Sequence, residues 1–425
     1  MKKRILPNEL LFFISYGIFV TMSLLKTTLV YHYIPELFFK AVLVFCTLII
    51  VAGEVFAGKG TRRMIGALLV GCAYIALAVF VQVPRYLVIA ATVILMFAAR
   101  KIPFRRVAFF SAILLTVVLA IVILLSQTGF IQDYVLDDGY GRIRHYLGFG
   151  YALFPATVLM NITMLVVYVR KQYILWLEII ILFAANVGIF VLTGSRLSFA
   201  LSVIVIVAGA FLKIWPDFLV KKKKIKYVLC LCFIVAALGS LFISYKYDPS
   251  SAVQVKLNNL LSDRLEHQKT AMDEYGFSIF GQEVEMNGNG LNADGEMVYD
   301  EETEDYFYID NNYVAWYVQN GVIFFVIMIG LCTAMTIRSV RYDKRGYLLI
   351  VFVLMSLFCV IQDTFLLIHY NTFLLAAGNL LMNNRDEETI EQEAGMVRRA
   401  WTRHGLRFKR KISARTGIRS GVRWS

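Results

Sequence analysis

The amino-acid sequence predicts an all-α polytopic membrane protein with about twelve transmembrane helices. Of its 425 residues, 59% are apolar and only 17% are charged, and the mean hydropathy is +0.65. A soluble domain carries charge on about a quarter of its residues. The charges also lie in short clusters between apolar runs, and about 20 apolar residues cross a bilayer as a helix. Transmembrane β-strands show only about ten alternating residues, which excludes a barrel here.

Apolar runs of membrane length recur along the whole chain. The twelve predicted spans are 9–25, 34–55, 64–81, 84–99, 107–126, 148–169, 173–193, 197–215, 227–244, 312–335, 347–362 and 365–382. The turns inside 64–99 and 347–382 are short, so each pair can include a re-entrant or tilted helix. The basic start at 1–4 resembles a signal peptide, but no small-residue cleavage site follows, which favours a retained first helix.

These spans divide the chain into four parts. The parts are nine helices over 1–244 with an external segment at 127–147, a large acidic external loop at 245–311, three helices over 312–382 and a basic tail at 383–425.

Basic residues gather in alternate loops and at both ends of the chain, and this distribution predicts the orientation. The clusters lie at 2–4, 59–63, 100–106, 170–171, 221–226, 338–345 and 398–423. All fall on one side of a twelve-span topology, and Lys and Arg mark the cytoplasmic side. Both termini are therefore predicted to be cytoplasmic. The net charge of +13 follows from this topology, so the sequence predicts lipid headgroups rather than nucleic acid as the partner of the basic tail.

Four arginines lie on the predicted external side, where such residues are rare. They are Arg142, Arg144, Arg196 and Arg264, each close to a helix end. A guanidinium stays charged and binds phosphate through two parallel hydrogen bonds. Each arginine alone can instead reach headgroups or pair with an aspartate. Together they predict an anion site at the outer membrane surface, and a pyrophosphate on a lipid carrier suits such a site.

Several short motifs occur in an order that resembles one family. They are 144–149 (Arg-His-Tyr-Leu-Gly-Phe), 192–196 (Leu-Thr-Gly-Ser-Arg), 262–265 (Ser-Asp-Arg-Leu), 279–282 (Ile-Phe-Gly-Gln) and 310–313 (Asp-Asn-Asn-Tyr). The set resembles the bacterial oligosaccharide repeat-unit polymerases of the Wzy type, in the superfamily shared with O-antigen ligases. The resemblance covers roughly residues 140 to 380. Family members often carry His-Pro-Asn after Leu-Gly-Phe, whereas this chain has Tyr-Ala-Leu at 151–153, so no role of that histidine carries over.

The resemblance implies a glycosyltransferase of capsule, exopolysaccharide or O-antigen biosynthesis in the bacterial cytoplasmic (inner) membrane. A growing chain on undecaprenyl pyrophosphate is the donor, and a lipid-linked repeat unit is the acceptor. A chain-length regulator and a flippase of the same pathway are possible partners. The external arginines are then expected to bind the pyrophosphate. The candidates for the general base, in order of preference, are Asp310, His267, His145 and Asp363.

Alternatives remain open at this point. Asp310 can equally cap the helix that follows it. The stretch 285–296 approximates a calcium loop, although its first position is Glu and its eighth is polar. The sequence predicts neither a metal nor a cofactor. An O-antigen ligase has a similar architecture, and a lipid-linked oligosaccharide flippase or other transporter also commonly has a dozen spans. No repeat relates the two halves, which disfavours a transporter.

Overall fold

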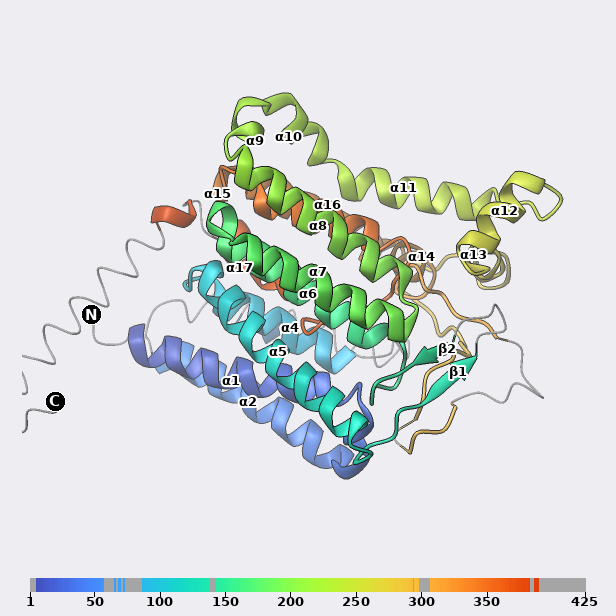
Figure 1. The fold of residues 1–425 in the computed structure, drawn as a ribbon, viewed down its shortest axis with the longest axis horizontal. Coiled ribbons are helices and arrows are strands. Elements are labelled where there is room, and N and C mark those ends of the chain that lie inside the picture. Colours follow the sequence, from blue (N-terminus) through green and yellow to red (C-terminus); the bar gives the residue numbers. More distant parts are fainter. Residues whose placement is uncertain are drawn as a thin grey trace, which may run out of the picture.

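The structure is a mostly helical assembly whose long helices lie side by side (Figure 1). This computed structural model describes residues 5–56, 86–137, 143–292, 294–297, 306–382 and 386–389, together with 65, 68, 69 and 72. Most of the predicted span 64–81 and most of the basic tail lie outside the described residues.

The helices and strands follow the order of the apolar runs. They are α1 (Ile5–Leu25), η2 (Leu29–Tyr33), α2 (Glu36–Phe56), α4 (Tyr86–Ala99), α5 (Phe104–Gln127), β1 (Val135–Asp137), β2 (Ile143–His145), α6 (Leu153–Arg170), η3 (Lys171–Tyr173), α7 (Trp176–Thr193), α8 (Arg196–Ile214), α9 (Phe218–Lys221), α10 (Lys223–Leu229), α11 (Cys232–Tyr245), α12 (Ala252–Leu260), α13 (Arg264–Glu274), α14 (Asn312–Val318), α15 (Val322–Tyr342), α16 (Tyr347–Phe358), η4 (Thr372–Leu375) and α17 (Ala376–Met382).

Several of these helices have membrane length. Within the described part of the chain, six are long and apolar enough to cross a bilayer, and a seventh crossing is added if α10 and α11, bent by 43° at their junction, form one span. Among the six candidate spans α6 is the most enclosed, with 78% of its span buried against 11% for α7. An apolar helix surface that is not buried in the protein requires lipid. The predicted membrane-helical class is thus confirmed, while the count of twelve stays a prediction.

Several predicted spans differ from the observed helices, and two of them differ most informatively. The predicted span 312–335 is two helices, because α14 ends at Val318 and α15 begins at Val322. The predicted span 365–382 starts too early, since helix begins only at Thr372. Residues 365–371 are apolar but form buried turns, in which Tyr370 N–H donates to the Leu367 carbonyl at 2.9 Å. Irregular backbone of this kind is tolerated at membrane depth where protein surrounds it.

The segments predicted to be external gather at one end of the helices. Figure 1 shows β1 and β2 at the same end as α12 and α13, whereas α9 and α10 lie at the opposite end. The strands form a short antiparallel hairpin that pairs Leu136 with Arg144. This hairpin is the one departure from an all-α architecture among the described residues.

Hydrogen bonds join three of the segments that were predicted to be external. Leu29 N–H, between α1 and α2, donates to the Gly148 carbonyl at 2.9 Å. Leu291 N–H, in the large loop, donates to the Gly150 carbonyl at 2.8 Å. The Tyr146 hydroxyl donates to the Asn289 carbonyl at 3.0 Å. The residues after β2 therefore connect the first external turn to the large loop, although these segments are far apart in sequence.

Gly281 and Gly321 fasten the large loop to the break between α14 and α15. Gly321 has φ +91°, and a Cβ there would lie 2.5 Å from the Gly281 nitrogen. We expect Gly321→Ala to destabilise the protein by more than about 1 kcal/mol, because alanine disfavours this φ and the backbones cannot separate. Thermal unfolding of the purified protein measures this. Gly330→Ala on α15 is the control, since nothing lies within 4 Å of its added Cβ. Equal unfolding midpoints in the two variants would contradict the expectation.

Candidate functional site

A cavity of about 840 Å³ lies at the end of the molecule where the external segments gather. Its walls come from β1 and β2, the α7–α8 turn, the α12–α13 turn and the segments around 306–310 and 361–362. The predicted site residues that line it are Arg144, Arg196, Arg264, His267 and Asp310. Packing thus brings together five residues from four separate stretches of sequence.

Arg144 reaches the cavity from β2. Its Nε donates to the Thr193 carbonyl at 3.0 Å, at the end of α7. Its side chain passes over Gly194, where a Cβ would lie 3.6 Å from the Arg144 Cγ. Gly194 has the left-handed φ of +64° that commonly ends a helix. The arginine therefore joins the hairpin to the α7–α8 turn while its charge lies at the cavity wall.

Arg196 is the first residue of α8 and is exposed. The preceding Ser195 is buried, and its hydroxyl donates to the Ala152 carbonyl at 3.2 Å, which anchors the turn. Among the described residues, no hydrogen-bond or ion-pair partner of the Arg196 side chain is found. The positive end of the α8 dipole adds to its charge. This guanidinium is thus held at the cavity with its hydrogen-bonding capacity available to an anion.

Residues 260–267 have helical spacing, but the helix is interrupted at Ser262 and Asp263, so α13 begins at Arg264. Ser262 and Asp263 adopt left-handed φ values of 56° and 61°. Such conformations are strained for residues with a Cβ and persist only where the surroundings hold them. Asn258 provides this support, since its Oδ1 accepts from the backbone N–H of Leu265 at 3.0 Å. The turn directs Arg264 toward Asp310.

Arg264 and Asp310 form a buried ion pair. Arg264 Nε lies 2.9 Å from Asp310 Oδ2, and the two side chains are only 16% and 8% exposed. Burial raises the pKa of Asp310, and Arg264 opposes this shift without cancelling it. Burial alone would lower the pKa of Arg264, but the charge of Asp310, its hydrogen bond and the neighbouring Tyr151 and Tyr306 together raise that pKa. A buried carboxylate with a raised pKa is a stronger base than one in water.

The interpretation of Asp310 as a helix cap is wrong. Asn311 occupies the N-cap of α14, and its Oδ1 accepts from the backbone N–H of Tyr313 at 2.9 Å. Its amide also donates to Gln268 Oε1 at 3.0 Å, which ties α14 to α13. Asn312 N–H donates to the Cys359 carbonyl at 2.9 Å. The two asparagines therefore fasten the segment, which leaves Asp310 as the member of the motif that faces the cavity.

His267 lies one turn after Arg264 on α13 and lines the same cavity. Its ring stands edge-on to Tyr306, with the ring centroids 5.2 Å apart. Burial lowers its pKa more than the neighbouring acidic side chains raise it. The imidazole is consequently neutral at pH 7 and can accept a proton.

Two other predicted site residues lie elsewhere, and one is not among the described residues. His145 does not line the cavity; its Nδ1 lies 2.7 Å from Asp133 Oδ2, so it braces the loop between β1 and α5. Asp363 lines a neighbouring cavity and accepts a hydrogen bond of 2.8 Å from the Tyr308 hydroxyl. Arg142 lies outside the described residues.

The neighbouring cavity, of about 460 Å³, contains residues that the sequence reasoning missed. It shares Tyr151, Asn289, Tyr306, Asp310 and Gln362 with the arginine-lined cavity. Tyrosine near a span end usually marks a membrane interface. The sequence therefore did not identify these tyrosines as site residues. One feature of the sequence could have indicated them, because two tyrosines lie four and two positions before the candidate base Asp310.

The fold and site define a helical membrane protein with a cavity at one end of its helices that is lined by three arginines and three aspartates. Comparison with models of known protein families, with curated proteins and with solved structures finds no match to this chain. Among the described residues, no group of three His, Cys, Asp or Glu side chains is arranged to hold a metal ion. The function is therefore argued from the cavity itself.

Proposed function

We propose that this chain is a glycosyltransferase that joins oligosaccharide repeat units carried on undecaprenyl pyrophosphate. In this proposal twelve helices cross the bacterial cytoplasmic membrane, both termini are cytoplasmic, and the cavity opens at the external face. The observation that carries the proposal is the convergence of Arg144, Arg196 and Arg264 on one cavity beside the buried Asp310. Fixed cations of this kind suit a pyrophosphate leaving group, and they lie where a lipid carrier would present it.

The reaction requires charge stabilisation and removal of a proton. A hydroxyl oxygen of the acceptor sugar bonds to the anomeric carbon of the donor. The bond from that carbon to the pyrophosphate oxygen breaks, and its electron pair leaves with the lipid pyrophosphate. The arginines stabilise the charge that grows on the leaving group. The hydroxyl proton passes to Asp310, whose raised pKa suits this role.

The role of Asp310 as base predicts a particular pH dependence. A carboxylate accepts a proton only above its pKa, so chain extension should fall as the pH drops through the raised pKa of Asp310. A general base contributes more than about tenfold to the rate. With Asp310 as the base, we expect His267→Gln to reduce extension by less than about tenfold and to keep the fall in extension at low pH, the acid limb of the pH profile. His145→Gln, outside the cavity, is the matched control. Loss of the acid limb in His267→Gln alone would assign the base to His267 instead.

An assay of the purified protein tests the proposed function. The substrate is a lipid-pyrophosphate-linked repeat unit from the same host, supplied without nucleotide sugars or ATP. A ladder of products that differ by one repeat unit is the expected result. If the substrate were returned unextended but crossed a liposome bilayer, a transporter would replace the polymerase.

A further inference from the structure

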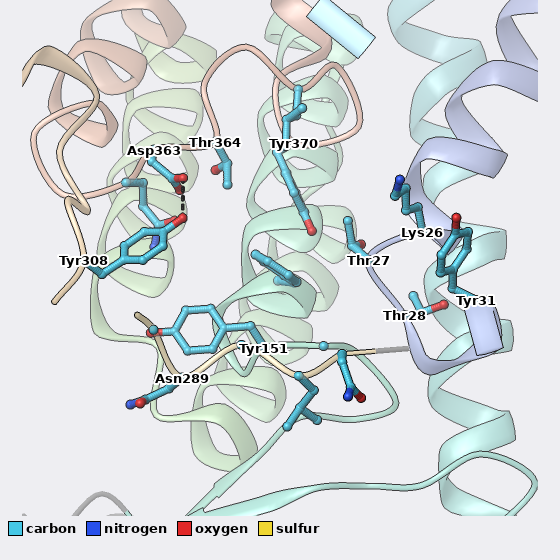
Figure 2. A pocket seen from close by; sticks show the side chains of 18 of the residues that line it. Lys26, Thr27, Thr28, Tyr31, Tyr151, Asn289, Tyr308, Asp363, Thr364 and Tyr370 are labelled. Atoms are coloured by element: carbon cyan, nitrogen blue, oxygen red, sulfur yellow. Dashed lines mark hydrogen bonds between the residues drawn. The ribbon is translucent and has the colours of Figure 1, made fainter. Parts of the chain in front are cut away.

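The cavity that contains Asp363 differs chemically from the cavity lined by arginines. Figure 2 shows Tyr151, Tyr308 and Tyr370 on one side of it, and Lys26 and Tyr31 on the other. Aromatic rings and hydroxyl, amide and carboxylate groups surround a volume of about 460 Å³. That volume lies within the range of small-ligand pockets.

These side chains match the surface of a sugar. A sugar ring presents C–H groups on its faces and hydroxyl groups around its edge. Tyrosine has an apolar ring that can cover such a face and a hydroxyl that can donate or accept. Asn289 and Asp363 supply amide and carboxylate groups that bond hydroxyls in two directions. The Tyr308 hydroxyl bonds to Asp363 Oδ2 at 2.8 Å (Figure 2), which holds both groups in place.

The charges of the two cavities favour different parts of a lipid-linked saccharide. Three arginines line the larger cavity, together with three aspartates, Asp137, Asp263 and Asp310. The smaller one has a single cation among its described lining residues, Lys26, and that lysine already pairs with Glu36 at 3.3 Å. The arginines of the larger cavity balance its aspartates, whereas the smaller cavity has Lys26 against Asp310 and Asp363. A pyrophosphate is therefore less disfavoured in the larger cavity, and an uncharged hydroxylated ring suits the smaller one.

The wall between the cavities is the place where the two parts would meet. Tyr151 belongs to both cavities, and its ring centroid lies 5.9 Å from the Arg144 Cζ. Asp310 belongs to both as well. A group that removes a proton from an acceptor hydroxyl must lie within hydrogen-bond reach of it and near the leaving group. Asp310 is the proposed base that satisfies this geometry.

We propose that the tyrosine-lined cavity, defined by Tyr151, Tyr308, Tyr370, Asn289 and Asp363, binds the terminal saccharide of the acceptor repeat unit. This assignment rests on the proposed function. The acceptor hydroxyl is directed to Asp310 at the shared wall, and the donor pyrophosphate occupies the arginine-lined cavity. Donor and acceptor thus enter from two sides of one carboxylate.

Two binding measurements on the full-length purified protein separate the cavities. The first probe is the repeat-unit oligosaccharide of the host, freed of lipid and pyrophosphate and observed by saturation-transfer NMR. The second probe is undecaprenyl pyrophosphate. We expect Tyr308→Phe and Asp363→Asn each to weaken oligosaccharide binding by about tenfold or more, because the first removes a hydroxyl partner and the second replaces a charged acceptor oxygen by an NH₂ donor. Both variants should bind undecaprenyl pyrophosphate within about twofold of the unmodified protein.

Two control variants complete the test. Arg196→Ala should show the opposite pattern, with weakened undecaprenyl pyrophosphate binding and unchanged oligosaccharide binding. Tyr245→Phe, an exposed tyrosine at the same end of the molecule and outside both cavities, should change neither. The unfolding midpoint of each variant is measured, and Tyr308→Phe serves alone if Asp363→Asn does not fold.

The outcomes distinguish this assignment from the proposed function. Unchanged oligosaccharide binding in Tyr308→Phe and Asp363→Asn, or its loss in Arg196→Ala, overturns the assignment of the cavity even if the protein extends chains. The expected binding pattern without any extension of a lipid-linked repeat unit supports a saccharide site but overturns the polymerase.

Discussion

Replacement of Arg196 by alanine is expected to reduce chain extension by about 100- to 1000-fold, the loss typical of one preorganised group that stabilises transition-state charge. Arg196 lies at the cavity, exposed and at the start of α8. Its guanidinium makes no hydrogen bond or ion pair to another described residue. The unfolding free energy should therefore change by less than about 0.5 kcal/mol, as for other surface substitutions. The measurement is the length distribution of polymer formed by equal amounts of membrane-inserted protein.

Two variants control this prediction. Lys256→Ala removes an exposed cation from α12 that does not line the cavity, so it should leave polymer length unchanged. Arg196→Lys keeps the charge but loses bidentate binding of phosphate, so its activity should be intermediate. Normal polymer length in Arg196→Ala would contradict a role of the arginines in binding pyrophosphate.

Replacement of Asp310 by alanine is expected to have two large effects. Extension should fall by about 100- to 10,000-fold if Asp310 is the general base. The protein should also lose about 3–5 kcal/mol of stability, because Arg264 would remain buried without its partner. Arg264→Ala should destabilise the protein for the same reason, which makes it a less informative test of pyrophosphate binding than Arg196→Ala.

A double variant separates these two effects. Arg264→Met combined with Asp310→Leu replaces the buried ion pair by apolar side chains, an exchange that is often neutral or stabilising. We expect its unfolding midpoint to return close to that of the unmodified protein while extension stays absent. Recovery of extension in the double variant would show that the pair has only a structural role.

The class of protein could be predicted from the sequence because hydropathy is a local property. Transfer of an apolar run into lipid depends on the residues of that run alone. The same holds for the clustering of Lys and Arg between spans. The four arginines that were predicted to be external were recognisable for the same reason, since the distribution of Lys and Arg along the chain is visible without coordinates. Three of them, Arg144, Arg196 and Arg264, do line one cavity.

Other features could not be predicted, because they depend on contacts between distant segments. His145 was a candidate base, but Asp133 holds it outside the cavity. The apolar pattern of 365–371 is that of a helix, yet surrounding helices bury this segment as turns. Local apolar pattern does not distinguish a buried turn from a buried helix. Burial by neighbouring elements decided both cases.

The sequence by itself determined a helical membrane protein and predicted its sidedness from the distribution of Lys and Arg. Only the tertiary structure decided that Arg264 pairs with Asp310, that Asn311 rather than Asp310 caps α14, and that tyrosines form a second cavity beside the first. The physical reason is that membrane insertion sums contributions along the chain. A site instead requires side chains from several segments to meet at distances of a few ångströms, and packing alone sets those distances.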